Sequence, residues 1–202
     1  ALSERRPFLS TRASRDLPFD DGDPLAVWNG NDPKYAAAYP VVVLGGAEML
    51  MSNNNDVAYS VHTPDGTEKY SKPAALAGPN TASPEQHVTA TADGELLIVA
   101  RVDGPPLPPF FKENSPRFHQ FTRTAPEPGD PFTGDDIVTP KAGPLPFAIC
   151  PVLSPDGLHL FFASTEALIL DESNADELVG IYFTSRPARD AAWGPVSKLA
   201  IA

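Results

Sequence analysis

The sequence predicts an all-β fold, and its composition and turns both support this. The chain of 202 residues contains 24 prolines and 14 glycines, and proline both removes a hydrogen-bond donor and clashes inside a helix. Apart from a short piece near residues 166–171, no stretch spaces its apolar residues at the helical period over several turns. Short apolar runs instead alternate with glycine-containing turns, which is typical of hairpins. The chain is long enough to bury a sizeable core.

Residues 148–199 carry the content of one four-stranded antiparallel sheet. Its first two extended segments flank the turn Ser154-Pro155-Asp156-Gly157. Proline pre-sets φ at an early turn position, aspartate bonds the local backbone, and glycine accepts a positive φ. The predicted strands lie within residues 149–153, 158–164, 181–186 and 193–199.

Both halves of this unit recur along the chain. Residues 8–19 align without a gap with residues 182–193, which places Arg12 on Arg186. Looser copies of this second half lie within residues 58–76 and 118–138. The first half recurs around the turn Asp93-Gly94 and again around Gly45-Gly46. Three first halves and four second halves therefore alternate, with a period of about 50–60 residues.

A repeated four-stranded unit of this length predicts a β-propeller. We expect one propeller segment of about three and a half blades, as a partial or open ring. A β-sandwich is the alternative, since it also uses short strands with regular turns, but the gap-free match favours repeats. The predicted parts are an outer half-blade at 1–27 and blades at 38–76, 86–138 and 148–199.

One family resemblance rests on the last unit. The hairpin from Pro151 to Phe162, the strand Ile181 to Arg186 and the later Trp193 resemble the WD-repeat-like β-propeller repeat of TolB-type proteins. The match weakens over residues 86–138, and further over 40–76, where a histidine and a tyrosine replace the arginine and the tryptophan. The resemblance implies a bacterial, often extracytoplasmic propeller that binds partners rather than performing chemistry.

Charge and cysteine content exclude several classes of function. The formal charge is −11, which disfavours nucleic acid and anionic membrane surfaces as partners. No apolar run reaches the length of a membrane helix, so we expect no membrane insertion, and no signal peptide is visible. Cys150 is the single cysteine, which excludes an internal disulfide and a cysteine metal site. We expect no cofactor.

The binding surface is predicted on the face formed by the loops between the second and third strands and by the blade-to-blade connections. All the long insertions fall on this face, and loops carry function more often than strands do. One such loop contains Phe110 and Phe111, which either contact a ligand or fold back onto a neighbouring blade. The acidic run from Asp171 to Glu177 offers oxygen ligands but lacks the spacing of a calcium loop, so we predict no metal site. The candidate binding residues are Phe110, Phe111, Arg101, Asp171, Glu172 and Asp176.

A second set of residues recurs at equivalent repeat positions and is interpreted as structural. Arginines end the third strand of three units, where we expect them to bond backbone or carboxylate groups within or between blades. The set comprises Arg12, Arg123, Arg186, Asp93, Gly94, Asp156, Gly157 and Trp193.

These observations predict a non-catalytic propeller scaffold that binds a protein, a peptide or a glycan, in the periplasm or outside a bacterial cell. No nucleophile motif is present. The alternative is part of a propeller enzyme, either a glycosidase or the accessory propeller of a serine peptidase, because paired carboxylates for hydrolysis assemble only in space.

Overall fold

The structure is a computed structural model, and it describes residues 8–9, 23–24, 37–53, 55–64, 69–103, 116–138, 148–165 and 179–200. In these ranges the ordered elements are β-strands, with one short 3₁₀ turn at Leu44–Gly46. The described residues contain no helix with the length and apolar character needed to cross a membrane.

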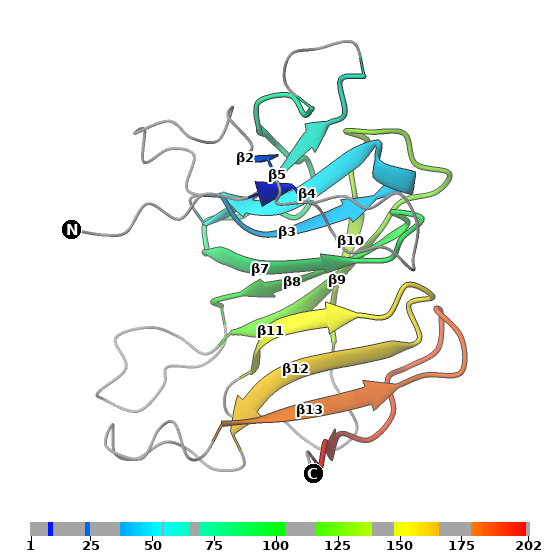
Figure 1. The fold of residues 1–202 in the computed structure, drawn as a ribbon. Coiled ribbons are helices and arrows are strands. Elements are labelled where there is room, and N and C mark those ends of the chain that lie inside the picture. Colours follow the sequence, from blue (N-terminus) through cyan, green and yellow to red (C-terminus); the bar gives the residue numbers. More distant parts are fainter. Residues whose placement is uncertain are drawn as a thin grey trace, which may run out of the picture.

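Twelve of the strands form three antiparallel sheets, and in each sheet the strand order follows the chain. Figure 1 shows the three sheets one after another, from cyan through green to orange. The first sheet contains β3 (Ala37–Val43), β4 (Glu48–Asn53), β5 (Asp56–Val61) and β6 (Ala74–Ala75). The second contains β7 (Glu85–Ala90), β8 (Leu96–Arg101), β9 (Arg117–Thr122) and β10 (Thr133–Ile137). The third contains β11 (Ala148–Leu153), β12 (His159–Thr165), β13 (Val179–Ser185) and β14 (Ser197–Lys198).

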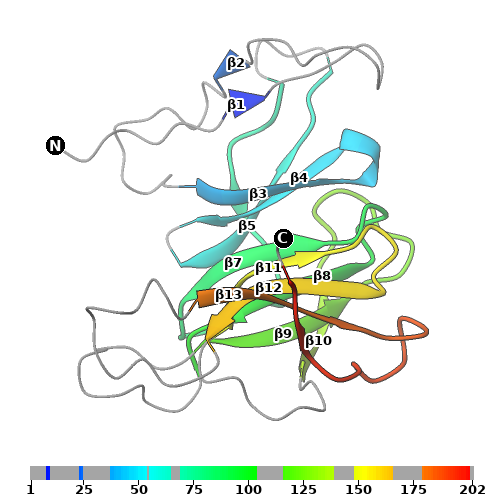
Figure 2. The same ribbon diagram turned by 60° about the horizontal axis from the view of Figure 1, so that its bottom comes forward.

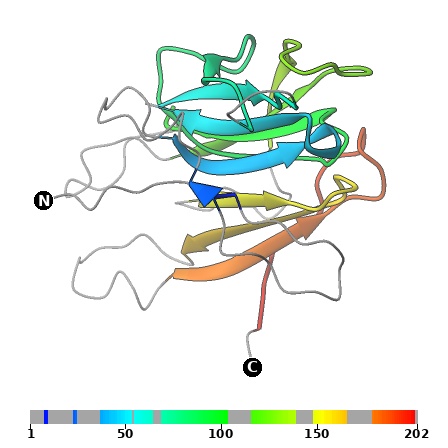
Figure 3. The same cartoon turned by 45° about the horizontal axis from the view of Figure 1, so that its top comes forward.

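The predicted outer half-blade at 1–27 is described at four residues. There β1 (Phe8–Leu9) pairs antiparallel with β2 (Asp23–Pro24), and Figure 3 shows this pair in dark blue. The first two strands of every four-stranded sheet share one irregularity. Their pairing register shifts near the start of the first strand, which is β3, β7 or β11. A repeated bulge of this kind bends each hairpin in the same way.

The second sheet lies between the other two and is covered on both faces. Side chains alternate along β8, so Leu97 and Val99 join the core with the first sheet, whereas Leu96 and Ile98 join the core with the third. All six residues of β8 are buried, and each fully buried aliphatic side chain contributes about 1.5–3 kcal/mol. Figure 1 shows the green second sheet between the cyan and the yellow-orange strands, and in the view of Figure 2 the yellow and orange strands overlie the green sheet.

These findings confirm the predicted fold class. Three consecutive four-stranded antiparallel sheets pack face to face, as blades of a β-propeller do. A two-sheet sandwich does not fit, because β8 has a separate sheet on each of its faces.

Local chemistry explains the first turn of the second and third sheets. The Asp93 carboxylate accepts hydrogen bonds from the Thr91 hydroxyl and the Glu95 backbone N–H. Asp156 accepts the equivalent bonds from Ser154 and from the backbone of the second residue after it. The glycine that follows each aspartate has a positive φ, 71° at Gly94 and 77° at position 157. The sequence pattern therefore specifies these turns directly.

Candidate functional site

An arginine closes the second and the third sheet in the same way. Arg123 Nε donates to the Gly94 carbonyl at 2.8 Å, and its guanidinium lies 4.4 Å from the centre of the Phe132 ring. Arg186 Nε donates to the Gly157 carbonyl at 3.0 Å. Its guanidinium lies 4.2 Å from the centre of the Trp193 ring. Each arginine thus ties the third strand of its sheet to the first turn and to the chain entering the fourth strand.

The first sheet makes the same connection with different residues. Tyr70 donates its hydroxyl to the Gly46 carbonyl at 2.8 Å, and the ring of His62 packs edge-on against it at 5.5 Å. A tyrosine therefore bonds the turn carbonyl where the other sheets use an arginine. Burial raises the pKa of Tyr70 above its ordinary value, so this phenol keeps its proton.

Backbone hydrogen bonds establish which residues are equivalent in the three sheets. The amide N–H of His62 donates to Ala47, that of Arg123 to Glu95, and that of Arg186 to Leu158. The residues one position after these acceptors are therefore equivalent to one another. They are Glu48, Leu96 and His159.

Between the first and second sheets, the guanidinium of Arg123 meets a buried carboxylate. Glu48 is fully buried and pairs with Arg123 Nη2. The same carboxylate accepts a 2.9 Å hydrogen bond from the Gly129 backbone N–H. Arg123 Nη1 also donates to the Asp130 carbonyl at 3.0 Å. This pair is stable although buried, because further hydrogen bonds satisfy both partners.

Between the second and third sheets, the described residues supply no equivalent carboxylate. Leu96 occupies the place equivalent to Glu48, and Arg186 Nη1 donates instead to the Gln120 amide oxygen at 3.0 Å. Two buried donors, Arg186 Nη2 and Trp193 Nε1, have no hydrogen-bond acceptor among the described residues. Burial lowers the pKa of Arg186, and the charge of Arg189 lowers it further, but a guanidinium remains protonated at neutral pH.

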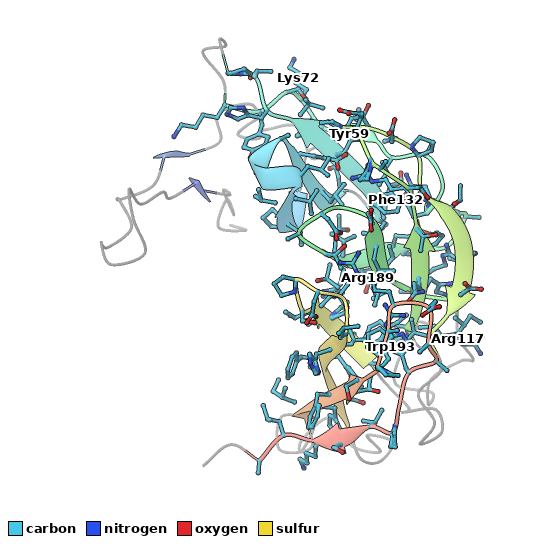
Figure 4. The ribbon with its side chains drawn as sticks, turned by 90° about the vertical axis from the view of Figure 1, so that its right-hand side faces the viewer. Tyr59, Lys72, Arg117, Phe132, Arg189 and Trp193 are labelled. Atoms are coloured by element: carbon cyan, nitrogen blue, oxygen red, sulfur yellow. The ribbon has the colours of Figure 1, made fainter. Side chains whose placement is uncertain are left out.

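A pocket of about 660 Å³ opens at this interface. Figure 4 shows Arg189 and Trp193 where the second and third sheets meet. Apolar, cationic and anionic side chains all contribute to the walls. They are Leu96, Ile137, Val138 and Trp193; Arg123, Arg186 and Arg189; and Glu95, Asp136 and Asp190, with Gln120, Thr122, Ala191 and Ala192 completing the lining.

Arg189 holds the rim of this pocket by bridging two turns. Its Nη1 donates to Glu95 at 3.0 Å, its Nη2 to Asp93 at 2.6 Å, and its Nε to the Asp156 carbonyl at 2.8 Å. Burial alone would raise the pKa of Asp93, but hydrogen bonds from Thr91 and Arg189 outweigh it and lower this pKa below the ordinary value.

The stabilisation that Arg189 contributes should depend on pH. The folded-state pKa of Asp93 is depressed, so its contribution is present above the unfolded pKa, near 4, and is lost as pH falls through the folded pKa. Because the pair is partly exposed, Arg189→Met should cost up to about 1 kcal/mol at pH 7. Urea unfolding should show this cost shrinking towards pH 3, and a cost independent of pH would contradict the assignment.

A second polar cluster, comprising Glu85, Arg101, Asp103, His119 and Asp135, lies at the opposite end of the second sheet. Arg101 donates to Glu85, to Asp135 and to the carbonyl of the proline at position 79. His119 lies between two carboxylates, at 2.6 Å from Asp135 and 3.1 Å from Asp103. Burial would raise the pKa of Asp135, but hydrogen bonds from Arg101 and His119 lower it. Burial raises the pKa of Glu85 despite its partners.

The structure places the predicted site residues in three groups. Arg101, a candidate for binding, is only 4% exposed and bonds internal partners. Asp93, Asp156 and their glycines form the turns, while Arg123, Arg186 and Trp193 form the contacts described above. Phe110, Phe111, Asp171, Glu172, Asp176 and Arg12 lie outside the described residues. No group of His, Cys, Asp and Glu side chains within the described ranges could hold a metal ion.

Sequence reasoning did not identify the inter-sheet pocket. The pocket lies at the end of the sheets that carries the first-hairpin turns, whereas the sequence favoured the long loops of the other end. Glu48, Leu96, Gln120 and Arg189 carry no motif. One signal was available in the sequence. When the repeats are aligned, Glu48 falls opposite Leu96, just after the turn of the first hairpin in each unit.

Comparisons with known proteins add the following findings. No family model matches the chain, and no curated protein matches it. Among solved structures, it is similar to a proposed 6-phosphogluconolactonase from Bacteroides uniformis, with a TM-score of 0.45 and 16% identity. It is also similar to the GH74 enzyme of Niastella koreensis, with a TM-score of 0.45 and 16% identity. Each match covers 80% of this chain, but 39% of the first structure and 22% of the second.

Proposed function

We propose that this chain is a non-catalytic propeller scaffold that binds a segment of a protein or peptide in the pocket between its second and third sheets. We further propose that it is a bacterial protein of the periplasm or the cell exterior, which rests on the resemblance of residues 148–199 to the TolB-type repeat.

The observation that carries this proposal is the pair of buried donors without acceptors. Arg186 and Trp193 are each 5% exposed, and one nitrogen of each has no partner among the described residues. A buried donor without a partner costs about 1–3 kcal/mol, and more when it is charged. A ligand that brings an acceptor to these atoms recovers that cost, which favours binding at this pocket.

The composition of the walls favours binding over catalysis. The described lining contains neither histidine nor cysteine, which are the side chains that most often transfer protons or attack substrates near neutral pH. Of the three carboxylates in the described lining, Glu95 is engaged by Arg189. The apolar side chains Leu96, Val138 and Trp193 lie beside charged and polar groups in the same wall, and a recognition site combines apolar contact with polar groups that orient the ligand.

Two alanines of one loop provide a matched test. Ala188 and Ala192 are both exposed, but Ala192 lines the pocket and Ala188 does not. We would select peptides from a random displayed library on the unmodified chain, and measure their binding to Ala192→Trp and Ala188→Trp by isothermal titration calorimetry. Both variants should remain folded because each new side chain starts from an exposed position.

The expected result is that selected peptides bind the unmodified chain and Ala188→Trp equally, and bind Ala192→Trp at least about tenfold more weakly, since the indole fills the pocket. Equal binding to both variants would contradict the proposal, as would a library that yields no binder. If an oligosaccharide on a glycan array binds the unmodified chain but not Ala192→Trp, the ligand of the pocket is a glycan and not a peptide. Turnover of that oligosaccharide would support an enzyme instead.

A further inference from the structure

The contact between the first and second sheets and the contact between the second and third sheets differ in one side chain, a glutamate in the first and a leucine in the second. Between the first and second sheets, the buried carboxylate of Glu48 receives the guanidinium of Arg123 and the Gly129 backbone N–H. Between the second and third sheets, Arg186 repeats the position of Arg123, with the same bond to a turn glycine and the same stacking on an aromatic ring. Leu96 stands where the glutamate would be, so no side chain in the described part of the chain supplies an anion at the second contact.

The pocket lies beside that missing group. Leu96, Arg186 and Trp193 all line it, and the two buried nitrogens without acceptors belong to the last two of these residues. A carboxylate has two acceptor oxygens, and a guanidinium binds them with strong, charge-assisted hydrogen bonds. Arg186 and Trp193 line the pocket, and each carries a buried donor for which the described residues supply no acceptor.

Resting on the function proposed above, we infer that the pocket binds the side-chain carboxylate of a glutamate or aspartate in the partner peptide. This carboxylate takes the place at the second and third sheets that Glu48 holds at the first and second. Arg186 is the principal cation, and the indole N–H of Trp193 is an additional donor. Leu96 and Val138 contact the aliphatic stem of the acidic side chain.

The surrounding charges select one acidic residue over a polyanion. The pocket walls include the carboxylates Glu95, Asp136 and Asp190, and the chain as a whole carries −11. A polyanionic ligand is repelled by this field. A ligand with one carboxylate flanked by lysine or arginine instead pairs these cations with Asp136 and Asp190, since Glu95 is already paired with Arg189. This charge pattern is available to a peptide but not to an acidic polysaccharide, which carries no cations.

The test compares two blocked peptides, Ac-Lys-Glu-Lys-NH₂ and Ac-Lys-Gln-Lys-NH₂. They have the same shape, and the second carries one more net positive charge, so non-specific attraction to this acidic chain favours the glutamine peptide. We expect the glutamate peptide to bind at least about tenfold more tightly, because it alone makes a charge-assisted bond. The readout is the indole ¹H–¹⁵N signal of Trp193, which is one of only two tryptophans and is assigned with Trp193→Phe.

Two variants at one position test whether the carboxylate takes the place of Glu48. Leu96→Glu supplies the missing anion within the chain, and should weaken binding of the glutamate peptide at least about tenfold relative to Leu96→Gln. Thermal unfolding of the two variants should show Leu96→Glu to be the more stable, because its carboxylate pairs with Arg186. Equal peptide binding or a less stable Leu96→Glu would overturn the inference.

The outcomes separate this inference from the proposed function. If the glutamine peptide binds as well as the glutamate peptide, while library peptides still depend on the pocket, the pocket binds peptides without an acidic anchor and the inference fails alone. If methyl glucuronide shifts the Trp193 signal at lower concentration than the glutamate peptide does, the carboxylate comes from a sugar and the inference is also wrong. If no library peptide depends on Ala192, the proposed function fails.

Discussion

Replacing Glu48 by leucine is expected to destabilise the chain by about 3–5 kcal/mol. Glu48 is fully buried, and its carboxylate is the partner of Arg123 and of the Gly129 backbone N–H. The leucine leaves a buried guanidinium without an anion and a backbone donor without an acceptor. Both costs arise at the contact between the first and second sheets, so urea unfolding measured by circular dichroism should report them directly.

Two further variants separate the lost ion pair from a general effect of the substitution. The double variant Glu48→Leu/Arg123→Met should recover part of the loss, because it removes the unpaired charge as well. Glu95→Leu, which removes a carboxylate from a partly exposed ion pair, should cost no more than about 1 kcal/mol. The assignment of Glu48 is wrong if its single replacement costs as little as that of Glu95, or if the double variant is less stable than the single one.

The second large effect is expected at Gly78, which lies in the connection between the first two sheets. Its φ is +112°, and a Cβ there would lie 2.0 Å from the Phe132 carbonyl oxygen. The neighbouring backbone cannot move away freely, because the Phe132 N–H donates to the Ala77 carbonyl at 3.1 Å. Gly78→Ala should therefore cost more than about 3 kcal/mol, measured as a fall in the urea midpoint of unfolding.

Gly134 is the matched control for this prediction. Its φ of +88° is similarly unfavourable for alanine, but the nearest atom to its Cβ would be 3.8 Å away. Gly134→Ala should then show the conformational cost alone, about 1–2 kcal/mol. Equal losses in the two variants would mean that the contact with Phe132 contributes nothing.

The two sheet contacts use the same arginine position in different ways. At the first contact the chain supplies both ions, so Arg123 serves the fold. At the second contact, the same arginine position retains a donor for which the structurally described ranges hold no acceptor. Stacking on Trp193 and the bond to the Gly157 carbonyl hold Arg186 in place without this acceptor.

The sequence by itself determined the fold class, because the features that specify it are local. The aspartate–glycine turns bond their own neighbours within a few residues, and alternating apolar residues identify the strands on either side. The recurrence of arginine and aromatic residues at equal spacing indicated one repeated sheet. Even the substitution of His62 and Tyr70 in the first sheet was visible as a departure from the repeat, although its hydrogen bond was not.

Only the tertiary structure decided where two sheets form ion pairs and where a pocket lies between them. Glu48 and Arg123 lie 75 residues apart, and Arg189 reaches Asp93 across 96 residues, so no local pattern links them. The buried Arg186 donor without an acceptor among the described residues is the clearest case, since Leu96 reads in the sequence as an ordinary core residue. The effect of Leu96 depends on Arg186 in the next sheet, because a buried charge finds a hydrogen-bond partner only among the groups that pack against it.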